Sequence, residues 1–252
     1  MKRILSYVAL GLCAFLVFAV ALLPADRVYS WLKPSLGGAV LYDVRGTFWS
    51  GKAAAAKVNG KLYRAVQWSM SPWTIVLGRL DANVRFDNGD SWAQGRVGIT
   101  AGKQLRFTDV TAQMSAAEVR PMFPRIVLDF AGTFVLKLAD AEFDPQSNKL
   151  SGVSGELTWV DATLGSVNGM ALGTFKLALT SAADGITGKL ADDGKGPLSA
   201  EGTLLLKSDN TYQLTGSLAA RDTSRSDLVL ALRGIGQPDS DGRVKISYNG
   251  AL

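Results

Sequence analysis

Apolar and polar residues alternate along most of this chain. Apolar side chains recur two positions apart from residues 40–44 onward, and the pattern returns in separate segments as far as 244–248. A period of two places successive side chains on opposite faces of a strand, so each segment predicts a half-buried β-strand. The segment 228–232, in which leucine occupies every second position, is predicted as a strand for the same reason.

Turn signals separate these segments. Asn88-Gly89, Asp184-Gly185 and Asp241-Gly242 are dipeptides that accept the left-handed conformations of tight hairpin turns. The chain also has 27 glycines against 8 prolines, as expected of many short strands joined by turns. We therefore expect a mainly β protein, an antiparallel β-meander that forms either a curled sheet or a sandwich.

Two segments interrupt the alternation. Residues 71–78 have a proline near the start and a glycine at the end, which predicts one or two turns of helix or a tight crossover. Residues 115–124 carry Ser115 and Glu118 at the spacing of a capping box and end in prolines, which predicts a second short helix. That helix would divide the β region into halves at 37–124 and 125–252.

The N-terminus is strongly apolar. Residues 4–23 contain no charged side chain, and roughly 20 apolar residues at about 1.5 Å each span the hydrocarbon core of a bilayer. Lys2 and Arg3 precede the run, so the positive-inside rule keeps the N-terminus cytoplasmic. We expect a cytoplasmic stub and a single transmembrane helix within 1–25, with residues 26–252 as a β-rich domain outside the cytoplasm.

A cleaved signal peptide is the alternative for the same segment. Residues 19–21 read Ala-Val-Ala, which could serve as a small-residue cleavage site. The apolar run is longer than an ordinary signal core, and this length favours a retained helix. Beyond it, Tyr29, Trp31 and Lys33 are expected at the level of the lipid head groups.

Composition argues against a catalytic or nucleic-acid-binding protein. The sequence has no histidine, which removes the commonest general base and metal ligand, and its one cysteine, Cys13, lies in the predicted span. The 27 basic and 22 acidic residues are scattered, with no basic cluster of the kind that binds nucleic acid. No catalytic residue, cofactor site or metal site is therefore predicted.

Carboxylates are the remaining candidates for chemistry. Asp140, Glu142 and Asp144 alternate along one segment, and Asp192 and Asp193 stand beside a glycine. Paired carboxylates can cleave glycosides or bind calcium, but a solvated strand face or a turn explains both groups more simply. We assign them no catalytic role.

The most distinctive residues lie in the first third of the chain. One block, residues 44–51, places an aromatic pair between two glycines, and a second, residues 66–73, contains two tryptophans and a proline. Six residues of these blocks are candidates for structural or partner contacts: Gly46, Trp49, Gly51, Trp68, Pro72 and Trp73. Burial in the core is the favoured interpretation of Trp49 and Trp68, and an exposed partner contact is the alternative.

These blocks carry a family resemblance. Leu-Pro-Ala at 23–25, Gly-Thr-Phe-Trp-Ser-Gly at 46–51, Gln-Trp-Ser-Met-Ser-Pro-Trp at 67–73 and Gly-Arg-Leu at 78–80 resemble the type II secretion system protein N family of Gram-negative bacteria. The resemblance implies a single-pass inner-membrane protein with a periplasmic domain, an accessory component in the export of folded proteins across the outer membrane. The family is not known for an enzymatic activity.

Two classes of function follow as expectations. In the first, the periplasmic domain is a scaffold or assembly factor that contacts other secretion subunits, either the secretin or the inner-membrane connector. In the second, it carries a lipid or another hydrophobic ligand in an apolar β-groove. The second class stays open because a sheet with one apolar face must meet a second sheet, curl on itself or hold a ligand.

Overall fold

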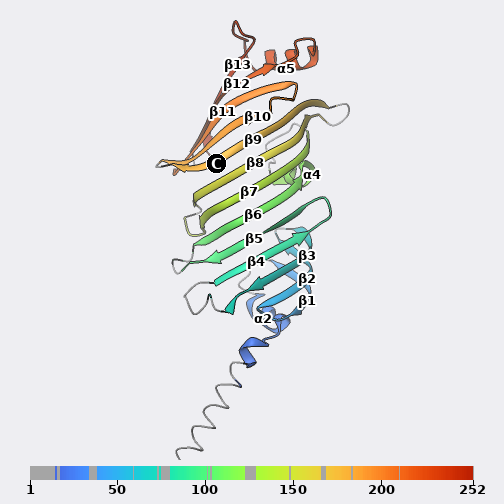
Figure 1. The fold of residues 1–252 in the computed structure, drawn as a ribbon, viewed down its shortest axis with the longest axis vertical. Helices are drawn as coiled ribbons and strands as arrows, with labels where there is room; N and C mark the ends of the chain where they lie inside the picture. Colours follow the sequence, from blue (N-terminus) through green and yellow to red (C-terminus); the bar gives the residue numbers. More distant parts are fainter. Residues whose placement is uncertain are drawn as a thin grey trace, which may run out of the picture. The chain divides into compact units, whose positions relative to one another are not determined.

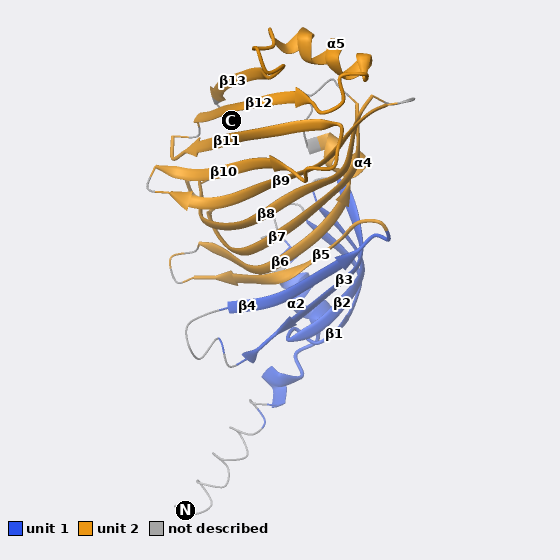
Figure 2. Cartoon of the chain, turned by 45° about the horizontal axis from the view of Figure 1, so that its top comes forward, with its two compact units in different colours: residues 1–89 blue, residues 90–252 orange. Residues whose placement is uncertain are grey.

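The computed structural model divides into two compact units, residues 1–89 and residues 90–252 (Figure 2). The division follows Gly89, whereas the halves expected from the sequence meet after residue 124. The structure describes residues 15, 18–33, 39–58, 60–72, 74, 80–100, 102, 104–122, 129–147, 149–165, 169–182, 184–209 and 211–251.

The described residues of the first unit include a small antiparallel sheet and the helix α2 (Figure 1). Its described elements, in chain order, are α2 (Ala25–Leu32), β1 (Val40–Gly46), β2 (Ser50–Val58), β3 (Lys61–Met70) and β4 (Leu80–Asp87). Each strand pairs antiparallel with the next along the chain. The helix contacts β1.

The second unit repeats this plan with more and longer strands (Figure 1). Its described strands are β5 (Trp92–Ile99), β6 (Leu105–Ser115), β7 (Phe130–Asp144), β8 (Lys149–Leu164), β9 (Met170–Ala182), β10 (Gly185–Asp192), β11 (Leu198–Lys207), β12 (Thr211–Ala220) and β13 (Val244–Ala251). Its described helices are α4 (Ala116–Val119), the 3-10 turn η2 (Arg120–Met122) and α5 (Ser226–Ile235). The strands pair antiparallel in chain order, which confirms the predicted β-meander.

Pairing register gives the second unit one apolar and one polar face. Leu136 pairs with Leu157, which pairs in turn with Leu177 on β9. The neighbouring register pair, Lys137 and Glu156, points to the opposite face because successive side chains alternate. The strands of each unit form a single layer in the described residues, so the sandwich alternative is not what the structure contains.

Bulges bend the long strands of the second unit. The pairing of β7 with β8 shifts around Gly132, and that of β8 with β9 shifts just after Trp159, where Asp161 has a φ of 50°. Gly132 has a φ of +112°, and a Cβ on it would lie 2.6 Å from the Val160 carbonyl oxygen, so glycine is required there. An extra residue increases twist and bends a strand, in agreement with the curved β7, β8 and β9 of Figure 2.

The main core of the second unit lies between α5 and the sheet. Leu228 and Leu232 of α5 are 2% and 5% exposed, and they pack in one cluster with Phe175, Leu198 and Val244 of the strands. Leu228 and Leu232 are four residues apart and therefore share one face of the helix. Burial of this face holds α5 on the apolar side of the sheet.

The strand predicted at 228–232 is wrong, because these residues form part of α5. Leucines at 228, 230 and 232 fit a period of two, but Leu230 is 65% exposed, so only the helical pair is buried. Asp227 in the first turn and Arg233 in the last both complement the helix dipole. These two charges indicate a helix in the sequence, but the alternation of leucine over five residues also fits a strand.

The helix predicted at 115–124 is confirmed as α4 followed by η2, although Ser115 makes no capping hydrogen bond through its side chain. Of the segment 71–78, only residues 71, 72 and 74 are described. Among the described residues no helix is both long and apolar enough to cross a bilayer. Most of the predicted span, residues 4–14, 16 and 17, lies outside the described residues, and so does Cys13.

Candidate functional site

The hairpin between β1 and β2 is the centre of the candidate site. The Thr47 backbone N–H donates to the Ser50 carbonyl at 2.9 Å, and the Ser50 N–H donates to Thr47 Oγ1 at 3.1 Å, which closes a tight turn. Gly46 enters the turn with a φ of +95°, and a Cβ there would lie 2.6 Å from the Ser50 carbonyl oxygen. Gly46 and Gly51 are register partners at the base of the turn.

This hairpin binds the end of the N-terminal apolar segment. The Phe48 N–H donates to the Leu23 carbonyl at 2.8 Å, and Trp49 Nε1 donates to the Val20 carbonyl at 2.7 Å. Pro24 forms an isolated β-bridge with Thr47. The last carbonyls of a helix have no partner within the helix, so the hairpin supplies donors where the helical turn at 18–21 ends.

Trp68 on β3 fixes the hairpin from the sheet side. Its Nε1 donates to the Phe48 carbonyl at 3.0 Å, so Phe48 is bonded through both its backbone groups. The indole also covers Gly51, because a Cβ on that glycine would lie 2.4 Å from Trp68 Cζ2. Gly51 is therefore required for the close approach of the ring rather than for an unusual φ.

An apolar cavity of about 210 Å³ lies beside the hairpin, between α2 and the sheet of the first unit. Ala25 and Val28 of α2 are buried against it, and Phe48 and Trp68 line it from the opposite side. The hydroxyl of Tyr29 accepts a hydrogen bond from the Leu41 N–H at 2.9 Å, which ties α2 to β1. Apolar packing and this bond together position the helix.

The six candidate residues fall into two groups. The structure brings together Gly46, Trp49, Gly51 and Trp68 around one hairpin, with both indoles half-buried and both N–H groups bonded to carbonyls. Pro72 is exposed just after β3, and Trp73 lies outside the described residues.

Sequence reasoning missed four residues of this site. The hydrogen bonds of Val20, Leu23 and Phe48 use backbone atoms, and a backbone contact leaves no residue-type signal. Tyr29 was assigned to a head-group layer, but its hydroxyl reaches β1.

The sequence pattern of the family "Type II secretion system (T2SS), protein N" matches residues 38–247. The chain belongs to this family. It is 28% identical to the type II secretion system protein N of Aeromonas hydrophila over 258 aligned residues, and 27% identical to that of Vibrio cholerae over 256, in both cases with 100% of both chains covered. No solved structure matches it. Membership assigns the chain to type II secretion.

The carboxylates that this family member could have used for chemistry have structural partners. Arg106 donates to both oxygens of Asp140 at 3.0 Å. Asp144 accepts from Gln146 N–H and Ser147 in a turn, and the Ser147 hydroxyl is the largest cause that lowers the pKa of Asp144. These residues support hairpins and strand pairs.

Asp192 departs from the expectation of a solvated turn. Its side chain is 10% exposed and pairs with Arg221, and it also accepts from the backbone N–H groups of Gly194 and Ala200 at 2.7 and 2.9 Å. Burial alone would raise the pKa of Asp192, but the Arg221 guanidinium and the two N–H donors outweigh it and lower the pKa to about 2. Asp193 closes the same turn by accepting from Lys195 and Gly196 N–H.

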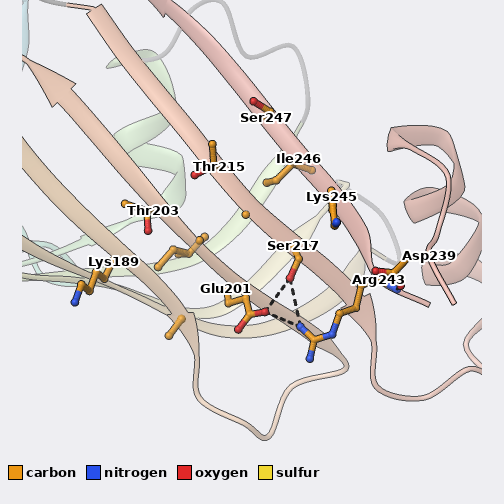
Figure 3. Close-up of a pocket in the computed structure, with 14 residues that line it drawn as sticks. Lys189, Glu201, Thr203, Thr215, Ser217, Asp239, Arg243, Lys245, Ile246 and Ser247 are labelled. Carbon is orange, nitrogen blue, oxygen red and sulfur yellow. Dashed lines mark hydrogen bonds and ion pairs between the residues drawn. The ribbon is translucent and has the colours of Figure 1, made fainter. Parts of the chain in front are cut away.

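The polar face of the second unit contains a broad groove over β10 to β13 with a volume of about 930 Å³ (Figure 3). Arg243 Nη1 donates to Glu201 Oε1 at 2.6 Å, and the Ser217 hydroxyl donates to the same oxygen at 3.0 Å. The Glu201 side chain is 66% exposed, so this is a solvated ion pair. No group of three or more metal-ligating side chains occurs among the residues that the structure describes.

Proposed function

We propose that this chain is a non-enzymatic accessory component of the type II secretion system. It is anchored in the inner membrane by its N-terminal segment, and its β-rich periplasmic domain acts as a scaffold that contacts other secretion subunits. Family membership and a sequence without histidine support this assignment.

The contact between the β1–β2 hairpin and residues 20–24 is the observation that carries the proposal. A flexible tether would only confine the domain near the membrane and raise its effective concentration. Two backbone-directed hydrogen bonds and a β-bridge also fix the direction in which the first unit leaves the anchor. The proposed scaffold uses both effects: confinement to the membrane and a fixed orientation toward its partners.

Anchor replacement tests the requirement for this arrangement. Exchange of residues 1–25 for a cleavable signal should sharply reduce export of a type II substrate, with partial rescue by overexpression. The matched control replaces residues 1–17 by an unrelated transmembrane helix and keeps residues 18–25, which contact the hairpin; export should persist. Wild-type export by the released domain at native expression would overturn the scaffold proposal.

Topology is tested with a reporter that is active only in the periplasm, fused after Leu252. The fusion should be active, and the chain should stay in the membrane fraction at full length. Recovery of a shortened periplasmic form would instead support cleavage after residues 19–21.

Partner contact is tested by a photo-crosslinking residue at Tyr42 or Tyr248, which are 47% and 54% exposed in the first and second units. Adducts with the secretin or the inner-membrane connector are expected in cells that assemble the secretion system. Adducts should be absent at the same positions when those subunits are deleted. Labelling that persists unchanged in the deletions would contradict a scaffold that contacts these subunits.

A further inference from the structure

A second apolar cavity, of about 300 Å³, lies between α5 and the sheet of the second unit. Its walls come from strands β8 to β12 on one side and from α5 on the other. The residues that define its shape are Trp159, Phe175, Leu190, Leu198, Leu228 and Ala231. The walls are part of the main core, so the cavity is built into the fold.

All the described residues that line this cavity are apolar. A water molecule inside a protein needs two to four polar partners, and an apolar cavity of this kind excludes it. A peptide segment would bring N–H and C=O groups that find no partner on these walls. The lining therefore selects a ligand without polar atoms along the inserted part, which is the chemistry of an aliphatic chain.

The size of the cavity agrees with such a ligand. An apolar cavity of ~150 Å³ accommodates the six carbons of benzene, so by proportion about 300 Å³ accommodates about ten to twelve. The same sheet face continues with Leu157 and Leu177, which gives a longer chain further apolar surface. Ile235 lines the cavity and is 48% exposed, so the rim at the C-terminal end of α5 is also apolar.

We propose that this cavity binds one acyl chain of a membrane phospholipid, with the head group in solvent. The site is independent of the scaffold function proposed above, since it lies wholly in the second unit and uses none of the hairpin residues. Ile235 at the cavity rim is 48% exposed, so the entrance offers an apolar side chain to an acyl chain that leaves a bilayer.

The test uses membranes that contain the full-length chain and vesicles of phosphatidylethanolamine and phosphatidylglycerol with a diazirine at the end of one acyl chain. After photolysis, adducts should map by mass spectrometry to the cavity walls on β9 and α5. Ala231→Phe, which fills the cavity from the helix, should reduce these adducts at least tenfold. Leu190→Trp fills the cavity from the sheet and should reduce the adducts by the same factor. It keeps the test valid if Ala231→Phe disrupts α5.

Ala191→Phe is the matched control, because Ala191 is exposed and lines the groove on the opposite face. It should leave labelling unchanged, and all three variants should keep wild-type circular dichroism. Absence of adducts from the cavity walls overturns the proposal, as does labelling that survives both filling variants. Cross-links from the walls to a second copy of the chain or to a partner protein, in place of lipid, overturn it as well.

Discussion

Each of the two units has a sheet with an apolar part to cover, and the two cover it in different ways. In the described residues each unit is a single antiparallel layer, and a short helix packs over an apolar part of it, α2 in the first unit and α5 in the second. Each also leaves an apolar cavity under that helix, of about 210 Å³ and about 300 Å³. In both, a tryptophan side chain lies against a glycine of the neighbouring strand: Trp68 against Gly51 in the first unit, and Trp159 against Gly132 in the second.

The difference lies in how the covering segments are held. In the first unit, the Tyr29 hydroxyl accepts a directed hydrogen bond, and the Trp49 and Trp68 indoles donate one each, and these bonds join the helical segments, the hairpin and the sheet. In the second unit, α5 is held by the burial of Leu228 and Leu232. Directed hydrogen bonds fix an orientation, as the proposed scaffold requires of its first unit. Apolar packing has no required direction, so the core under α5 can also accept the proposed acyl chain.

The largest expected effects come from the two tryptophans. Trp68→Ala should destabilise the first unit by about 3–5 kcal/mol, through lost burial and loss of the bond to the Phe48 carbonyl. Trp159→Ala should cost the second unit about as much, since Trp159 stacks on Phe134 with centroids 5.3 Å apart and donates to the Ala131 carbonyl at 3.0 Å.

Amide hydrogen exchange, measured separately for β1–β3 and for β7–β9, distinguishes the loss of stability in the first unit from that in the second. Each variant should raise exchange mainly in its own unit. Normal exchange and melting of Trp68→Ala, with export lost, would show instead that Trp68 is a partner contact.

Asp192 should give the second unit a pH dependence of about 2 kcal/mol. Its pKa is lowered from 3.8 to about 2, so its ionised form stabilises the fold above pH 3.8, and this stability is lost as the pH falls through about 2. Asp192→Asn should therefore be less stable than the wild type at pH 7 and nearly equal at pH 2. Urea unfolding across this range measures the difference, and a constant difference at every pH would contradict it.

Glycine substitutions should act in opposite directions in the two units. Gly51→Ala should cost about 1–3 kcal/mol, because the new Cβ overlaps the Trp68 ring and must displace it. Gly234 of α5 has nothing within 4 Å of the added Cβ, so Gly234→Ala should stabilise by about 0.5–1 kcal/mol. Thermal melting of the pair tests this, and a neutral Gly51→Ala would mean that Trp68 has room to move.

The comparison also explains what could be predicted from the sequence. Alternation and turn dipeptides predict most strands because each strand buries one face, and pairing in chain order follows from short connections. The α5 helix was missed because its apolar residues satisfy both periods within a window of five. The bulge at Asp161, where φ is 50°, and the positive φ of 47° at Ala65 could not be predicted, since neither position carries glycine.

The candidate site also contains some residues that could be predicted from the sequence and others that could not. Gly46, Gly51, Trp49 and Trp68 could be singled out because unusual residue types mark close backbone approach. Their partners could not, because the Val20, Leu23 and Phe48 atoms that they bind are backbone carbonyls and N–H groups common to every residue. The cavity under α5 consists of ordinary core residues, so only their arrangement in space distinguishes it.

The smallest expected effects come from partly exposed carboxylates of the second unit, and they test whether that unit has any chemistry. Asp140→Asn keeps the shape of the side chain and removes the charge that faces Arg106, where the Asp140 side chain is 30% and the Arg106 side chain 48% exposed. Partly exposed pairs contribute about 0–1 kcal/mol, so stability should change by no more than that. Glu142→Gln and Asp144→Asn should behave alike, and export of a type II substrate should stay near the wild-type level in all three, because no step of the proposed function needs an ionised carboxylate. An amide variant that folds, remains anchored and abolishes export would reassign that carboxylate to catalysis or to an essential partner contact.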